Sequence, residues 1–498
     1  MELFHNLVFG FSVALTWQNL WYCFIGCFLG TLIGVLPGIG PLATIAMLLP
    51  ITFNVAPVAA LIMLAGIYYG AQYGGSTTAI LVNLPGETSA VVTCIDGYQM
   101  ARQGRAGPAL AIAAIGSFFA GTVCTLIIAL FGPPLAEIAL KFGAPEYFSL
   151  MLMGLVAAAV LAGDNITKAL AMVVMGLLLG IIGTDVNSGM ARYSFGIPEL
   201  TDGIGFIVIA VGVFAIGEIV GNLGDPEERL VFTNKVTGLM PTKKDLKDSF
   251  WPIVRGTSIG AFMGVLPGTG PSIASFSSYM VEKKMSKTPE RFGKGAIEGV
   301  AGPESANNAD AQCKFIPTLT LGIPASATMA LMLGALTIQG IAPGPQVMTQ
   351  KPDLFWGLVA SMWIGNAMLV ILNLPMISLW VMLLKVPYRL LFPAIMAFSC
   401  IGIYSVNNSP FELYLTAIFG LIGFVWQRLD MPPAPMLLGF VLGPLMEENL
   451  RRALLISRGD PTVFVTRPIS LGFIIATVLI LIVMLAPAVK QNRQHITG

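Results

Sequence analysis

Long apolar runs bounded by short polar loops recur along the whole chain. The clearest are 109–130, 147–161, 204–220, 355–374, 412–426 and 469–485. Each is near the ~20 residues that a helix needs to cross ~30 Å of hydrocarbon. The runs are continuous, whereas the strands of a membrane barrel alternate between apolar and polar residues. Because backbone groups in lipid must be satisfied internally, the pattern predicts an all-α integral membrane protein with about 10–12 transmembrane helices.

Composition supports this class and disfavours others. Of 498 residues, 55% are hydrophobic and 11% are charged, against roughly a quarter charged in soluble domains. The net charge of +1 comes with no basic tail or patch, so we expect no nucleic-acid partner. The only histidines, His5 and His495, lie at the chain ends. We therefore expect no enzyme, and a membrane-embedded enzyme is the weakest alternative because the spans lack a base or metal cluster.

An eight-residue motif occurs twice. Gly-Val-Leu-Pro-Gly-Ile-Gly-Pro at 34–41 returns at 264–271 with a single mismatch. Weaker pairs follow in the same order, 81–86 with 320–325 and 145–148 with 352–355. Such order indicates an ancestral duplication, from which many secondary transporters are built.

The repeated Pro-Gly-x-Gly-Pro core interrupts a helix, because proline lacks an amide hydrogen and glycine favours open backbone. In the second half it divides the apolar stretch 252–280 into arms of ~14 residues, or ~21 Å, short of the ~30 Å needed to cross. Both flanks are rich in cations, which keeps short loops cytoplasmic. These are Arg229, Lys235, Lys243, Lys244 and Lys247 before it, and Lys283, Lys284, Lys287, Arg291 and Lys294 after it. The pattern predicts a re-entrant hairpin open to the cytoplasm.

The first copy, at about 20–53, has the opposite surroundings, since residues 1–19 and 54–58 contain no Lys or Arg. We therefore expect an outward-facing hairpin and two inverted repeats, each with a re-entrant hairpin and a broken helix. The expected divisions are a first repeat (1–222), a cytoplasmic linker (223–250), a second repeat (251–467) and a last transmembrane helix with its tail (468–498). The sides of the 447–467 loop and of the C-terminus stay open, because arginines precede the last span and cations also follow it.

Broken, polar backbone at membrane depth is tolerated where it is buried in protein or lines a cavity. Exposed amides at a helix break attract anions, and freed carbonyls hold cations. The alternative is that Gly, Ser and Thr only permit close helix packing. The candidate substrate or ion-binding residues are Gly38, Ile39, Gly40, Ser76, Thr77, Thr78, Asn83, Gly268, Thr269, Gly270, Asn307, Asn308, Lys314 and Ser326.

Ionisable groups beside these breaks are also suspects, because charge is costly at this depth. They are Glu87, Glu304, Asp310 and Lys314. Asp310 and Lys314 stand four residues apart, so either they neutralise each other or Lys314 contacts a ligand. No G-x-x-x-x-G-K-[ST] motif occurs. We therefore expect no ATPase in this chain and transport coupled to Na⁺ or H⁺, with a separate ATPase subunit as the open alternative. We also expect no cofactor and no metal site, since Cys23 and Cys27 have no further ligands nearby in the sequence.

Five motifs of this sequence resemble those of one transporter family. They are Leu-Pro-Gly-Ile-Gly-Pro at 36–41, Tyr-Gly-Gly-Ser-Thr-Thr-Ala at 73–79, Asp-Gly-Tyr at 96–98, Ala-Gly-Pro-Glu-Ser-Ala-Asn-Asn-Ala at 301–309 and Leu-Gly-Ile-Pro at 321–324. They look like the large membrane subunit of tripartite tricarboxylate transporters (TctA), over nearly the whole chain. The family's motif positions fall here on 37–41, 74–78, 267–271, 304–309 and 322–324.

The resemblance implies a multi-pass protein of the bacterial cytoplasmic (inner) membrane. It implies two partners, a small four-helix membrane subunit and a periplasmic solute-binding protein that delivers a carboxylate, with Na⁺ or H⁺ symport and kinship to elevator-type carriers. One departure is Gln312-Cys-Lys314, where the family tends to small residues, and it puts citrate-type specificity in doubt. The sequence does not choose between tricarboxylates, dicarboxylates and aromatic acids. The runner-up is a stand-alone symporter or channel for small organic anions that needs no binding protein.

Overall fold

A computed structural model describes residues 2–36, 40–83, 85–161, 165–185, 188–222, 238–266, 270–383 and 388–485. These residues are almost entirely helical, and within them one sheet pairs β1 (Gly183–Thr184) with β2 (Ala191–Arg192). The all-α prediction is confirmed. Three described helices are long and apolar enough to cross a membrane: α7 (Ala106–Ala139), α18 (Pro352–Asn373) and α21 (Pro410–Arg428). Shorter apolar helices accompany them, and the total of about 10–12 spans stays a prediction.

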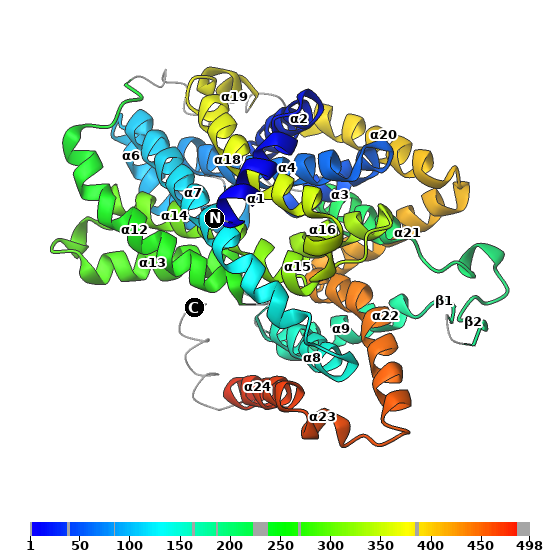
Figure 1. Cartoon of the computed structure of the whole chain (residues 1–498). Helices are drawn as coiled ribbons and strands as arrows, with labels where there is room; N and C mark the ends of the chain where they lie inside the picture. The colour runs from blue at the N-terminus through cyan, green and yellow to red at the C-terminus, as the bar shows by residue number, and fades with distance from the viewer. Residues whose placement is uncertain are drawn as a thin grey trace.

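The first half of the chain folds into these further elements: α1 (Glu2–Ala14), α2 (Trp17–Gly34), α3 (Pro41–Leu48), η1 (Leu49–Asn54), α4 (Pro57–Val82), η2 (Thr88–Ala90), α5 (Val91–Thr93), η3 (Cys94–Tyr98), α6 (Gln99–Arg102), α8 (Ala144–Leu161), α9 (Ile166–Gly180), η4 (Pro198–Leu200), α10 (Phe206–Ile209), η5 (Ala210–Ile216) and α11 (Gly217–Asn222). Figure 1 shows α4 in the interior, with α2 and α3 beside it.

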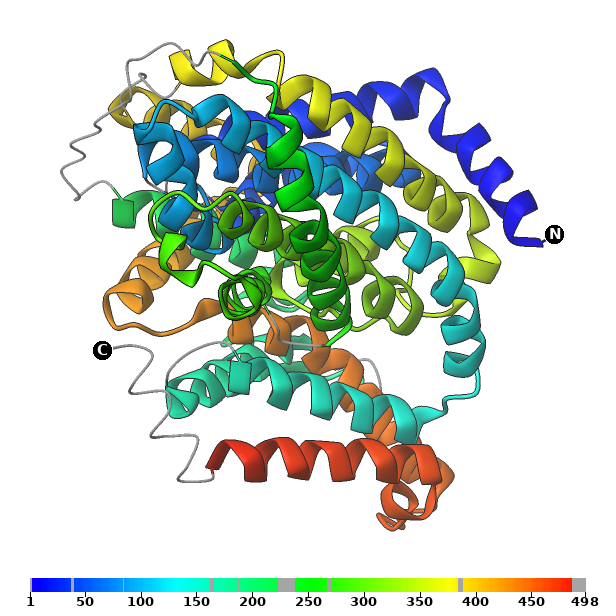
Figure 2. The ribbon, with the colours of Figure 1, turned by 90° about the vertical axis from the view of Figure 1, so that its left-hand side faces the viewer.

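The second half adds α12 (Lys243–Val265), α13 (Pro271–Met285), η6 (Pro289–Arg291), α14 (Glu298–Cys313), α15 (Phe315–Leu321), α16 (Ala327–Ile338), α17 (Gln346–Gln350), α19 (Ile377–Leu383), α20 (Tyr388–Asn407), α22 (Pro433–Ile456), α23 (Val463–Thr466) and α24 (Pro468–Leu485). In Figures 1 and 2, α24 lies at one edge of the molecule, packed on α8, and α22 lies against α8 and α9. Helix α1 packs on α18.

The helices α2 and α4 pack through glycines spaced four residues apart. A Cβ on Gly26, Gly30 or Gly34 would come closer than 3.0 Å to the α4 backbone. The carbonyls in the way belong to Met63, Ile67 and Ala71. Contact this close between backbones requires the smallest residue on one side. The sequence predicts these glycines within the first hairpin, at about 20–53.

The same packing recurs between α12 and α14. A Cβ on Gly256, Gly260 or Gly264 would come closer than 3.0 Å to the α14 backbone. The carbonyls in the way belong to Gly302, Ala306 and Asp310. Each glycine lies 230 residues after its counterpart on α2, and each carbonyl 239 residues after its counterpart on α4. The repeated sequence motif therefore belongs to a repeated helix pair, which we call the first and second glycine-packed pairs.

Helices also end at equivalent positions in the two halves. Helix α4 ends at Asn83 (φ 59°) and α15 ends at Gly322 (φ 70°), both in the left-handed region. These positions are also 239 residues apart. Helices α3 and α13 begin at Pro41 and Pro271, with Gly40 and Gly270 as extended N-caps. Helices α2 and α12 therefore end before the undescribed segments 37–39 and 267–269, and α3 and α13 begin after them, where the sequence predicts interruptions.

One helix start differs from the prediction. The sequence placed the first arm of the second hairpin at Pro252, but α12 begins at Lys243 and passes through Pro252. Its 23 residues span ~34 Å, so the arm is longer than expected. Thr242 and Asp245 form a capping box that starts the helix earlier. The helical turns that precede Pro252 carry charged residues, among them Lys243, Lys244 and Asp245.

Asp96 joins the two halves. This fully buried residue of η3 accepts hydrogen bonds from three backbone amides of the loop after α13: those of Gly293 (2.9 Å), Gly295 (2.7 Å) and Ala296 (2.8 Å). The Tyr279 hydroxyl donates to its other oxygen at 2.9 Å. The π-helical turn from the first half and the cation-rich loop of the second half are thus held together.

Candidate functional site

Helix α14 is polar and yet wholly inside the protein. Every residue from Gly299 to Cys313 is buried, including two carboxylates and three side-chain amides. Buried polar groups are costly unless they are paired, so their partners define the site. Most of these partners come from the first half of the chain, on α4, α5 and α7.

Glu304 is the carboxylate at the centre of this helix. It is 1% exposed. Ser76 Oγ of α4 donates to its Oε2 at 2.6 Å, and Thr93 Oγ1 of α5 donates to its Oε1. Both partners are neutral hydroxyls, and they lie more than 200 residues away in the sequence. Glu304 therefore ties α14 to the first half without a cation of its own.

Glu87 is a second buried carboxylate, 8% exposed, in the turn that follows α4. Ser89 Oγ and Asn307 Nδ2 (3.2 Å) donate to its Oε1. The side-chain amide of Gln72, with its nitrogen turned toward Glu87, also donates to Asn307 Oδ1 at 2.6 Å. Glu87 and Glu304 are close enough to interact electrostatically. Together with their hydroxyl and amide partners they form what we call the carboxylate cluster.

Asp310 and Lys314 form an ion pair, and both side chains are fully buried. The pairing that the i,i+4 spacing allowed is therefore present. Among the described residues, Asp310 Oδ1 has no hydrogen-bond partner. The ion-pair partner of Lys314 among the described residues is Asp310.

The side-chain amides of Asn308 and Gln312 on α14 face α7. Asn308 Nδ2 donates to Ser117 Oγ at 2.7 Å and to the Glu304 carbonyl at 3.0 Å. One turn further, Gln312 Nε2 donates to Thr125 Oγ1 at 2.7 Å. These bonds fix the orientation of α14 on the long apolar helix.

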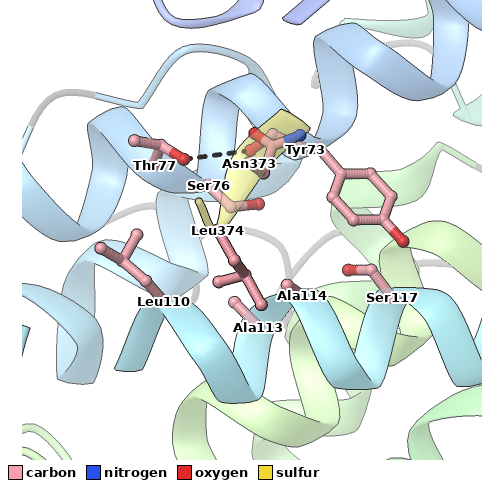
Figure 3. Close-up of a pocket in the computed structure, with 9 residues that line it drawn as sticks. All are labelled: Tyr73, Ser76, Thr77, Leu110, Ala113, Ala114, Ser117, Asn373 and Leu374. Atoms are coloured by element: carbon pink, nitrogen blue, oxygen red, sulfur yellow. Dashed lines mark hydrogen bonds between the residues drawn. The ribbon is translucent and has the colours of Figure 1, made fainter. Parts of the chain in front are cut away.

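A small cavity lies beside the carboxylate cluster, between α4, α7 and the end of α18 (Figure 3). Its volume is about 10 Å³, close to the minimum for one water molecule. Its lining comprises Tyr73, Ser76, Thr77, Leu110, Ala113, Ala114, Ser117, Asn373 and Leu374. Figure 3 shows the Tyr73 hydroxyl turned toward Ser117, and Thr77 Oγ1 donates to the Tyr73 carbonyl at 3.4 Å.

The structure brings part of the candidate set together. Ser76 and Asn307 belong to the carboxylate cluster. Asn308 lies on α14 and Lys314 directly follows it, and Thr77 lines the cavity. Four of these positions come from the motifs at 73–79 and 301–309, more than 200 residues apart, and Lys314 follows the second motif.

The remaining candidates lie elsewhere. Thr78 donates to the Val35 carbonyl at 2.8 Å, next to the first tip. Asn83 is an exposed left-handed cap, and Ser326 accepts from Met329 N at 3.3 Å as the N-cap of α16. Gly40 and Gly270 cap α3 and α13. The other tip residues, Gly38, Ile39, Gly268 and Thr269, are outside the described residues.

Several members of the site are absent from the sequence-derived set. Glu87 and Glu304 were suspected because of their charge, and Glu304 also lies in the family motif at 304–309, but neither is in the candidate set. Gln72 directly precedes the motif at 73–79. Ser89, Thr93, Ser117 and Thr125 carry no signal of their own, because single hydroxyls in apolar helices commonly bond to their own backbone. Within the described ranges, no group of three His, Cys, Asp or Glu side chains could hold a metal ion.

Comparison with known proteins adds a family to this geometry. The family described as "Tripartite tricarboxylate transporter TctA family" matches residues 20–438. An "Uncharacterized 52.8 kDa protein in TAR-I ttuC' 3'region" of Agrobacterium vitis is 59% identical over 496 residues, covering 100% of this chain and 99% of that protein. A second protein of that organism, from the "TAR-II ttuC' 3'region", is 59% identical over 237 residues, covering 48% of this chain and 98% of that protein. No solved structure matches.

Proposed function

This chain belongs to the tripartite tricarboxylate transporter TctA family, and we propose that it is the large permease subunit of a binding-protein-dependent secondary transporter. In this proposal it imports a tricarboxylate or a related organic acid by Na⁺ or H⁺ symport. Family membership makes the protein a transport component rather than an enzyme. The match over residues 20–438 is the observation that carries the proposal.

The geometry supports a carrier. Carboxylates, amides and one lysine are buried between helices of two equivalent pairs, at positions where charge is costly and is retained chiefly for function. The helix interruptions beside them lie at equivalent places in both halves. Carriers with internal repeats place substrate and coupling ions at such interruptions.

The proposed site for the substrate carboxylates is formed by the two tips and the helix starts behind them. Helices α3 and α13 begin at Pro41 and Pro271, so their free amides and positive dipole ends face the interruptions. Lys314 is the nearby cation proposed to balance the substrate, alongside Asp310. Which carboxylate is carried stays open.

The proposed surroundings follow from the family. We place the chain in the bacterial inner membrane with a small four-helix membrane subunit and a periplasmic solute-binding protein. The recurrence of the glycine-packed pair supports two structural repeats, and their opposite orientation in the bilayer, with an elevator-type movement, is part of the proposal.

Uptake of labelled organic acids by cells with and without this gene tests the function. We expect accumulation to require the chain and the secreted binding protein. It should collapse when ionophores dissipate the Na⁺ and H⁺ gradients while ATP is maintained. Accumulation without any binding protein would favour the stand-alone symporter or channel. Accumulation that follows ATP alone would contradict secondary transport.

A further inference from the structure

The carboxylate cluster contains two buried acids, Glu87 and Glu304, that form no ion pair among the described residues. The nearby cation Lys314 pairs with Asp310 instead. The partners of Glu304 are hydroxyls, and those of Glu87 are a hydroxyl and amides. Burying uncompensated carboxylates is costly, and a bound proton or cation removes that cost.

The donors around the two glutamates favour a proton over a metal ion. A sodium ion is held by oxygen lone pairs that point toward it, as other hard cations are. Here the side chain of Asn307 presents its nitrogen to Glu87, and the hydroxyls of Ser76 and Thr93 donate to Glu304. The amide nitrogen can only donate and so disfavours a cation beside Glu87, whereas the hydroxyls can rotate and accept from a protonated carboxyl on Glu304.

The cavity supplies an independent observation. Tyr73 and Asn373 line it and are only 4% and 5% exposed. Within the described residues, Tyr73 Oη and Asn373 Oδ1 have no hydrogen-bond partner. Unpaired buried polar atoms around a space for one water indicate that water enters it. Ser76 both lines this cavity and donates to Glu304 Oε2.

We propose that Glu304, beside Glu87, takes up the coupling proton, and that the cavity between α4, α7 and α18 brings this proton from water to it. This inference rests on the proposed symport. In the step, one O–H bond of a hydronium ion in the cavity breaks and one O–H bond forms on a Glu304 oxygen, so that a neutral water is left behind and no electron is transferred. Ser76 links the cavity water to the carboxyl, because it lines the cavity and hydrogen-bonds to Glu304.

Other titratable groups lie around the cluster, and Lys314 is the one cation among those that the structure describes there. They are Tyr68 and Tyr73 of α4, Cys94 of η3, and Asp310 and Lys314 on the helix of Glu304 and just after it. Arg255 of α12 is already paired with Glu282 of α13 at 2.5 Å.

Infrared spectroscopy of the full chain in nanodiscs tests the acceptor directly. We expect a carboxylic-acid C=O band to grow as the pH falls from about 8 to about 5, the range in which a perturbed carboxyl titrates. The band should be lost in Glu304→Gln and kept in Glu146→Gln. Glu146 is a matched control, because it is equally buried but already paired with Arg467 at 2.6 Å.

Ser76→Ala tests the route and guards against misfolding of the first variant. It should keep the band, but slow its rise after a rapid pH drop, because the contact with the cavity is lost. A purely structural role of Ser76 would leave the rate unchanged. A band that persists in Glu304→Gln, or never forms in the wild type, overturns the assignment.

Transport measurements separate this inference from the proposed function. In vesicles containing the complete system, a pH gradient should drive carboxylate uptake in the wild type and in Glu146→Gln, but not in Glu304→Gln. Uptake driven by Na⁺ and indifferent to pH would overturn the proton assignment while leaving symport intact. If no gradient drives carboxylate uptake but the infrared titration holds, the proposed function fails instead.

Discussion

The two glycine-packed pairs share their packing but differ in chemistry. Helix α2 lies on α4 as α12 lies on α14, through glycines at equivalent positions. The faces they position are different: Tyr68 and Tyr69 of α4 correspond to Asn307 and Asn308 of α14, 239 residues later. The glycines cannot be replaced by larger residues, because the two backbones are in close contact there. The residue types at neighbouring positions could differ between the two copies. The repeat therefore keeps a scaffold, while the two copies carry different polar groups: Gln72 and Ser76 on α4, and Glu304 and Asn307 on α14.

A further difference concerns the turns after these helices. Glu87 follows the left-handed turn of the first half, and Ser326 occupies the equivalent place in the second half, where it caps α16. The turn of the first half contributes a carboxylate to the cluster, while the equivalent turn of the second half contributes a helix cap. A duplicated fold thus has an asymmetric candidate site.

The largest effect is expected from filling either glycine contact. Gly30→Leu and Gly260→Leu each force a side chain into backbone that a Cβ alone would already overlap. We expect both variants to lose folded protein in detergent, measured by size-exclusion chromatography. Gly472→Leu is the control, since nothing lies within 4 Å of a Cβ there. A folded Gly260→Leu beside an unfolded Gly30→Leu would show that the pairs are not equivalent.

Breaking the buried ion pair should rank second. Asp310→Asn or Lys314→Met leaves one uncompensated charge, which costs about 3–5 kcal/mol. The double variant removes both charges and should recover most of the lost unfolding free energy, measured by denaturant titration. If the double variant is as unstable as either single one, the pair is not the stabilising unit. Transport by the double variant would exclude Lys314 as a substrate contact.

Removing one polar contact at the site should affect transport more than stability. Asn308→Ala leaves Ser117 without its donor, at a cost of about 1–3 kcal/mol. We expect membrane insertion to persist and substrate uptake to be abolished. Gly268→Leu should behave alike, because the sequence predicts a glycine tip there in which only backbone fits. Normal uptake by both variants would assign these motifs to packing.

Ser326→Ala should have the smallest effect. It removes the N-cap of α16 and should lower the unfolding free energy by about 1 kcal/mol. Glu87→Ala, at the equivalent place of the first half, should instead impair transport, because it removes a carboxylate from the cluster. Denaturant titration and uptake assays on both variants measure the two effects. Equal loss of transport in the two variants would contradict the asymmetry of the halves.

The sequence predicted the helical class, the repeat and the places where helices stop, because Pro-Gly motifs act locally. It also indicated the Asp310–Lys314 pair, since i,i+4 spacing fixes proximity on one helix. The start of α12 was wrong because the capping box at Thr242 outweighs the proline at 252. The partners of Glu304 were beyond reach, because Ser76 and Thr93 meet it only through tertiary packing.

The central claim is that two equivalent halves face opposite sides of the membrane, and cysteine accessibility tests it most directly. Single cysteines at the exposed positions Gln18, Phe53, Lys243 and Lys287, in a cysteine-free background, flank the two hairpins. Gln18 is preferable to its neighbour Asn19, which is buried. The account predicts labelling of 243 and 287 from the cytoplasm only, and of 18 and 53 from the periplasm only. Labelling of 243 and 287 from opposite faces, or of all four from one face, would contradict the inverted repeat.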